Sequence, residues 1–152
     1  MHVRRVGFGF HAVATLALIA FGWTYLSSSE FMPYHAAALG TDWENLPPGL
    51  QVLGLTALRL VGVGSFALGL ALGVILWVPY RRGERWALWA VPILGSGYGL
   101  ALSFAAFSVA SATPGNPPWR SAGVLPLLFL MGGILSLVPE PPDPVVGNGG
   151  RS

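Results

Sequence analysis

The chain has 152 residues, of which 53% are hydrophobic and only 9% are charged. Soluble domains usually carry about 25% charged residues, so a soluble fold with this composition could not coat its surface, and lipid is the expected solvent. The chain has eight arginines and no lysine, and the arginines lie in short clusters between apolar runs. This pattern is typical of residues that set the orientation of a membrane protein, and not of a nucleic-acid-binding surface. The absence of cysteine excludes disulfides, thiolate metal sites and thiol redox catalysis.

The first apolar segment covers residues 6–27 and follows Arg4 and Arg5. A secretory signal peptide is the alternative interpretation. The apolar run is longer than the hydrophobic region of such a peptide, and no small-x-small cleavage site follows directly, so a retained membrane helix is predicted. His11 lies near the start of this helix, where it either forms a hydrogen bond within the bundle or relays protons.

A polar connection follows over residues 28–49. It contains Glu30, Asp42 and Glu44 and no lysine or arginine. Its last part contains Pro47 and Pro48. It predicts a turn that leads into a helix, because proline is tolerated in the first turn of a helix.

The second segment, residues 54–78, lies in the longest apolar run and contains a single charge, Arg59. Ser65, Gly69 and Gly73 recur every four positions along it. Small residues at this spacing let two helix backbones approach closely, so they are predicted to form a helix-packing face.

The third segment, residues 86–110, follows a short basic turn, and the fourth covers residues 122–138. Gly95 and Gly99 predict a second packing face on the third helix. Tyr98 lies between them and is expected to face the bundle interior and to donate a hydrogen bond to a backbone carbonyl. A contact with a ligand is the alternative role for this side chain.

The arginines predict the orientation of the chain. One side of the membrane would hold Arg4, Arg5, Arg81, Arg82 and Arg85, and the positive-inside rule places that side in the cytoplasm. The sequence therefore predicts an all-α membrane protein, a four-transmembrane-helix bundle over residues 1–138 with both termini inside. Residues 139–152 are rich in proline and glycine and are predicted to form a disordered cytoplasmic tail.

In helix number, short loops and the basic turn RRGERWALWAVP, residues 81–92, the chain resembles small bacterial four-helix inner-membrane proteins of unknown function. The resemblance implies a multi-pass protein of the bacterial inner membrane. It is one of architecture and carries over no functional residue. Sterol-isomerase-like proteins share the helix count but use carboxylates inside the membrane, and the helix interiors of this chain hold none.

Candidate ligand-site residues gather at the outer end of the predicted bundle. They are Glu30, Tyr34, His35, Asp42 and Arg59, together with Tyr98 from deeper in the third helix. Arg59 is either an anion anchor for a lipid phosphate or substrate carboxylate, or it pairs with Glu30 or extends to the headgroups. Glu30 and His35 form either an acid/base pair or part of an interfacial loop.

No metal site or cofactor is expected. The spacing of His35, Asp42 and Glu44 matches no standard ligand pattern. The glycine clusters do not match the GxGxxG motif of dinucleotide-binding proteins, and no serine lies in the GxSxG motif of hydrolases.

The leading hypothesis is a non-enzymatic integral membrane protein that binds a lipid or apolar ligand, or that associates with other membrane proteins. The expected partners are membrane lipids, further copies of the chain or other membrane proteins, and not nucleic acid. The first alternative is a membrane enzyme or lipid-handling protein with an outer-leaflet site at Glu30, His35 and Arg59. The second is a subunit of an oligomeric transporter or channel.

Overall fold

A computed structural model describes residues 2–138, and all of the secondary structure in this range is helical. The elements in chain order are α1 (His2–Ser27), α2 (Pro33–Leu39), the 3-10 turn η1 (Trp43–Asn45), α3 (Pro48–Ile75), the π-helical turn η2 (Leu76–Tyr80), α4 (Arg85–Ala112), α5 (Trp119–Ala122) and α6 (Val124–Leu137). The predicted disordered tail, residues 139–152, lies outside the described residues.

Within residues 2–138, four helical stretches are long and apolar enough to cross a membrane, and they are Val3–Ser27, Pro48–Tyr80, Arg85–Ala112 and Trp119–Leu137. The prediction of an all-helical chain with four such helices is confirmed. The second stretch begins earlier than the predicted residue 54 because Pro48 opens α3 in its first turn, where the missing N–H costs no hydrogen bond.

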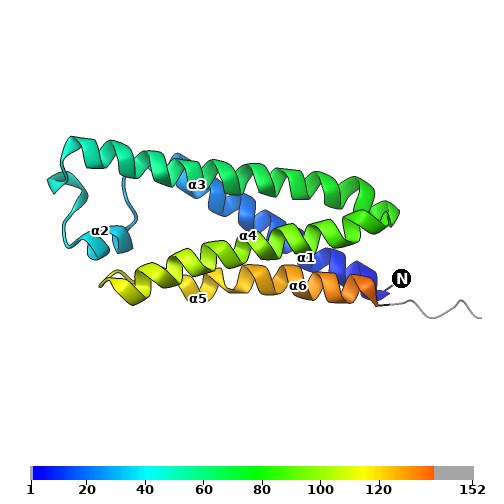
Figure 1. The fold of residues 1–152 in the computed structure, drawn as a ribbon. Helices are drawn as coiled ribbons and strands as arrows, with labels where there is room; N and C mark the ends of the chain where they lie inside the picture. Colours follow the sequence, from blue (N-terminus) through cyan, green and yellow to red (C-terminus); the bar gives the residue numbers. More distant parts are fainter. Residues whose placement is uncertain (1, 139–152) are drawn as a thin grey trace, which may run out of the picture.

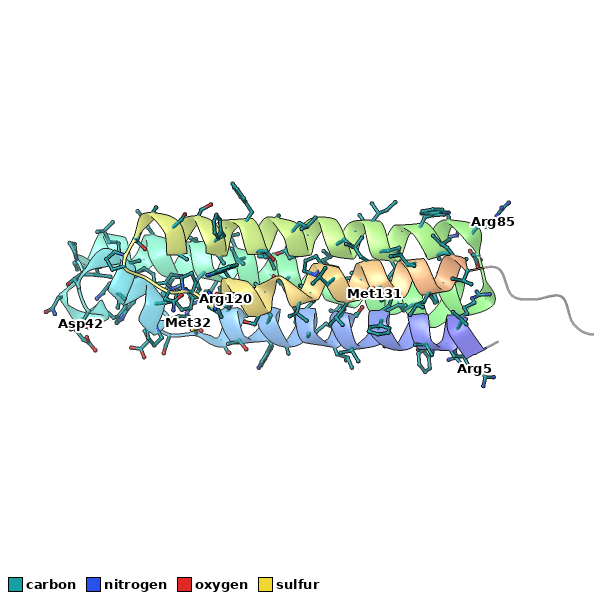
Figure 2. The ribbon with its side chains drawn as sticks, turned by 90° about the horizontal axis from the view of Figure 1, so that it is seen from below. Arg5, Met32, Asp42, Arg85, Arg120 and Met131 are labelled. Carbon is teal, nitrogen blue, oxygen red and sulfur yellow. The ribbon has the colours of Figure 1, made fainter. Side chains whose placement is uncertain are left out.

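The helices run side by side along one long axis (Figure 1). α1 packs mainly against α3 and α6, and α6 packs against α4, whereas the consecutive helices α3 and α4 touch little. We call the end formed by residues 28–47 and 113–118 the loop end, and the end formed by residues 2–5 and 81–85 the arginine end. Figure 2 shows Arg5 and Arg85 at the arginine end and Asp42 at the opposite end.

A very close backbone contact joins α1 to α3. A Cβ atom added to Gly22 would lie 2.5 Å from the Phe66 nitrogen and 2.9 Å from the Gly62 oxygen, and one added to Gly62 would lie 2.8 Å from the Leu26 nitrogen. All three atoms belong to helix backbones and cannot move aside independently. Glycine at both positions therefore lets the two helices meet at this distance.

The glycines that the sequence singled out lie at helix contacts of unequal closeness. A Cβ added to Gly69 would lie 2.6 Å from Ile19 Cγ1, but one on Gly73 would find its nearest neighbour at 3.9 Å, an ordinary contact. On α4, Gly95 lies against the ring of Phe129 of α6, and Gly99 would place a Cβ 3.0 Å from a backbone nitrogen of α6. Glycine at these two positions of α4 therefore lets α6 pack closely against α4.

The π-helical turn η2 contains Pro79 and brings Tyr80 into the bundle, where only 1% of the Tyr80 surface is exposed. Its hydroxyl is hydrogen-bonded to the hydroxyl of Ser136 on α6. Its carbonyl accepts a hydrogen bond of 2.9 Å from the Arg4 guanidinium of α1. One residue of η2 therefore links three helices at the arginine end.

The buried apolar core lies between the middle of the bundle and the arginine end. Its members are Ala14, Leu18, Leu72, Leu76, Tyr80, Ala87, Val91 and Phe129. The loop-end half has no comparable cluster among the described residues, so the interior of the bundle is filled unevenly.

We expect Gly22→Ala and Gly62→Ala each to lower the free energy of unfolding by about 1–3 kcal/mol, because an added methyl group would force the α1 and α3 backbones apart. The matched control is Gly97→Ala on α4, where nothing beyond the adjoining backbone of α4 itself lies within 4 Å of the added Cβ. That variant should be neutral or slightly stabilising, since alanine is the better helix former. Reversible unfolding in detergent micelles measures all three, and equal effects at Gly22 and Gly97 would contradict the close contact.

Candidate ligand-binding site

A cavity of about 390 Å³ lies at the loop end of the bundle. Its walls come from α1, α2, α4, α5 and the start of α6, with Val61 from α3 and Pro117 and Pro118 from the last loop. Several lining residues, among them Ala17, Val61 and Ala105, are exposed, so the cavity communicates with the surface.

Small side chains and a break between two helices create this cavity. Ala17, Ala105, Ala106 and Ala122 line it with methyl groups that are too short to fill the space between the helices. The last span is also interrupted, because α5 ends at Ala122 and α6 begins only at Val124. Several positions that face the interior at the loop end thus carry small side chains. Near the arginine end, leucine, valine and phenylalanine fill the interior.

Two tyrosines and a histidine provide most of the polar groups of the cavity wall. The Tyr25 hydroxyl of α1 is hydrogen-bonded to the Tyr34 hydroxyl of α2. The Nδ1 atom of His35 accepts a hydrogen bond of 3.3 Å from the Met32 N–H, which places the ring proton of neutral His35 on Nε2. Pro33 begins α2 and brings Tyr34 and His35 together, with ring centroids 4.3 Å apart.

The groups of the cavity wall are electrically neutral near pH 7. Burial, reinforced by the hydrogen bond that the Tyr34 hydroxyl forms with Tyr25, raises the pKa of Tyr34 above its ordinary value. Burial lowers the pKa of His35 below its ordinary value. No arginine, aspartate or glutamate lines the cavity. The arrangement therefore combines apolar walls with uncharged hydrogen-bonding groups at the end nearest α2.

The structure brings together only part of the predicted polar site. Tyr34 and His35 line the cavity, whereas Glu30, Asp42 and Arg59 are exposed and do not. Glu30 stands in the non-helical link between α1 and α2, so it does not share a helix face with Tyr34. Of the predicted group Glu30, His35 and Arg59, only His35 therefore lines this cavity.

Tyr98 lies outside the cavity wall and links α3 to α4. Its hydroxyl lies 2.9 Å from Ser65 Oγ, which itself donates to the Val61 carbonyl at 2.8 Å. Tyr98 is therefore the donor, and its partner is a side-chain hydroxyl and not the expected backbone carbonyl. This bond bridges two helices that otherwise touch little.

Several residues of the cavity were not singled out in the sequence. Tyr25 and Phe21 come from the last two turns of α1, and α4 contributes a stripe at helical spacing that consists of Leu102, Ala105, Ala106 and Val109. The stripe marks one face of α4 in the sequence. Only the packing shows that this face has no bulky neighbour.

Two buried polar side chains of α1 lie nearer the arginine end. Both ring nitrogens of His11 and the Thr15 hydroxyl lack a hydrogen-bond partner among the described residues. The His11 ring meets the Tyr80 ring edge-on at 5.4 Å and would lie 2.7 Å from a Cβ on Gly132. The predicted hydrogen bond of His11 within the bundle is therefore not found in residues 2–138.

Over residues 2–138, histidine, aspartate and glutamate form no group of three that could hold a metal ion. No protein-family model matches the chain, and comparison with the curated proteins and with the solved structures found no match.

We expect acid to loosen α2. Because burial lowers the pKa of His35, the unfolded segment binds the proton more tightly, and the stabilising contribution of neutral His35 is lost as the pH falls below about 6.5. Amide exchange of residues 33–39, corrected for intrinsic rates, should show lower protection at about pH 5 than at about pH 7.5. The His35→Gln variant keeps a donor but cannot titrate, so an equal loss of protection in that variant would contradict the assignment.

Proposed function

We propose that the protein is an integral membrane protein of the bacterial inner membrane that binds a lipid or another apolar ligand in the loop-end cavity, without catalysing a reaction. The observation that supports this most directly is the cavity itself. Its volume of about 390 Å³ falls within the range of about 300–1,000 Å³ that is usual for small-molecule sites. Its walls are mainly alanine, leucine, valine, proline and aromatic side chains.

Exposed apolar side chains on the outer faces of the helices support the membrane location. Phe104 is 72% exposed, Leu60 66% and Ile134 61%, and each lies on a different long helix. Apolar surface on this scale would favour aggregation in water, whereas it is stable in contact with the lipid hydrocarbon. The four long apolar helices supply the matching length.

The arginine end supports an orientation with both termini in the cytoplasm. Arg5 and Arg85 both lie at this end, and Asp42 lies at the opposite end (Figure 2). The Arg81 guanidinium also lies 4.7 Å from the centre of the Trp77 ring, a pair suited to a membrane interface. The loop end, and with it the cavity, would then face the outer leaflet.

The two alternative functions receive less support. An enzyme site built from Glu30, His35 and Arg59 would need all three around one cavity, and only His35 lines it. Passage of a solute through one protomer would need a continuous interior path, but the apolar core occupies the interior towards the arginine end. A binding role fits a cavity that ends within the bundle.

The Ala105→Trp variant tests ligand binding, because the indole would occupy the cavity and exclude an apolar guest. We expect protein purified from membranes to retain a bound apolar molecule that mass spectrometry detects in organic extracts, and Ala105→Trp to retain at least about tenfold less of it. Leu100→Trp is the matched control, since Leu100 is 57% exposed on another face of α4. Equal amounts in both variants would contradict the proposed site.

Single cysteines test the orientation without background labelling, because the chain has no cysteine of its own. Val3→Cys marks the arginine end, and Asn116→Cys marks an exposed position at the loop end. A membrane-impermeant maleimide added to intact spheroplasts should label Asn116→Cys and leave Val3→Cys unlabelled until the cells are lysed. The reverse pattern would overturn the orientation, and labelling of both would overturn the three crossings that the proposed topology has between these two positions.

A further inference from the structure

The hydrogen-bonding groups of the loop-end cavity can donate to a neutral acceptor. One proton of the Tyr25–Tyr34 pair is used in their mutual hydrogen bond, and the second hydroxyl proton has no other partner within residues 2–138. The Nε2–H of His35 is likewise without a partner there, since only Nδ1 of that ring is bonded. Two hydrogen-bond donors are therefore available at the same end of the cavity. They are one hydroxyl of the Tyr25–Tyr34 pair and the Nε2–H of His35.

The cavity offers nothing to balance a charge. None of its lining residues is ionised near pH 7, because Tyr34 and His35 are neutral and the arginines lie elsewhere. A carboxylate or phosphate moved from water into such a site loses its hydration and gains no counter-ion. A carbonyl oxygen loses far less and recovers its hydrogen bonds from the two donors.

Aromatic rings surround the same end of the cavity. Phe21 and Tyr25 lie with their ring centroids 4.3 Å apart, and the Tyr34 and His35 rings are equally close. Flat rings pack well in offset or edge-on contact with such side chains. Ala17 of α1 and Ala105 and Ala106 of α4 give the cavity a further apolar wall that suits an alkyl or prenyl chain.

We infer that the cavity binds an uncharged lipid whose head group is a carbonyl-bearing ring, the chemistry of a quinone, in preference to a fatty acid or a phospholipid. This inference rests on the proposed function, since it names the ligand class of the same site. The ring lies among the aromatic side chains, its carbonyl oxygen accepts from the tyrosine pair or from His35, and its chain runs along the alanines.

Three probes with the same ten-carbon chain separate the contributions of ring, carbonyl and charge. They are a decyl-substituted benzoquinone, decylbenzene and decanoate, each titrated calorimetrically into the purified full chain in detergent at neutral pH. The Ala105→Trp variant supplies the baseline for partition into micelles. We expect the benzoquinone to bind at least about tenfold more tightly than either other probe, because only it satisfies the donors without carrying a charge.

A variant pair tests the donors directly. The double variant Tyr25→Phe with Tyr34→Phe keeps the shape of the rings and removes both hydroxyls, so it should weaken benzoquinone binding about five- to tenfold and leave decylbenzene unchanged. Tyr98→Phe is the control, since it removes a hydroxyl that lies outside the cavity wall.

The outcomes separate this inference from the proposed function. If no probe distinguishes the wild type from Ala105→Trp, the proposed function fails and the inference fails with it. If the probes bind in the cavity but decanoate or decylbenzene binds as tightly as the benzoquinone, the inference alone is overturned. The comparison of the three probes on the wild type stands even if the double variant does not fold.

Discussion

The backbone contact between α1 and α3 at Gly22 and Gly62 is the constraint on which the rest of the bundle depends. α1 is the helix that touches both α3 and α6, so its approach to α3 also sets where α6 and, through it, α4 can lie. Tyr25 stands about one turn after Gly22 on α1. The closeness permitted by two missing side chains therefore places the hydroxyl that meets Tyr34 at the cavity wall.

The two halves of the bundle use residue size for opposite purposes. Near the arginine end, glycines admit large neighbours, as when Gly95 receives the ring of Phe129, and the interior is filled. At the loop end, alanines such as Ala105 and Ala106 stand where no large neighbour arrives, and a hollow remains. Dense packing supplies the rigidity, and the hollow half supplies the space in which a ligand is held.

Composition and hydropathy were sufficient to predict the helices, because runs of 20 or so apolar residues with few charges leave the backbone no other regular structure in lipid. The candidate site residues named from the sequence overlap with the cavity wall only in part, and their role in binding stays a prediction. Tyr34 and His35 line the wall, but Glu30 and Arg59 were grouped with them by their place in the sequence alone.

Glu30 and Arg59 lie outside the cavity wall for a physical reason that the sequence does not reveal. The distance between side chains at the loop end depends on the path of the short link between α1 and α2 and on the rotation of each helix about its axis. Neither quantity leaves a hydropathy signal. The same holds for Gly22, whose importance comes from the helix that happens to face it.

The wide turn at Leu76–Tyr80 has a consequence for how the chain tolerates insertions and deletions. A π turn accommodates one residue more than the α-helix around it, so everything after it is rotated by about 100° relative to an uninterrupted helix. Removing a single residue there would restore the ordinary winding and swing Tyr80 away from Ser136 and Arg4. The number of residues in η2 therefore matters to the fold as much as the side chains do. Insertion or deletion of one residue should be far less tolerated here than in the loops.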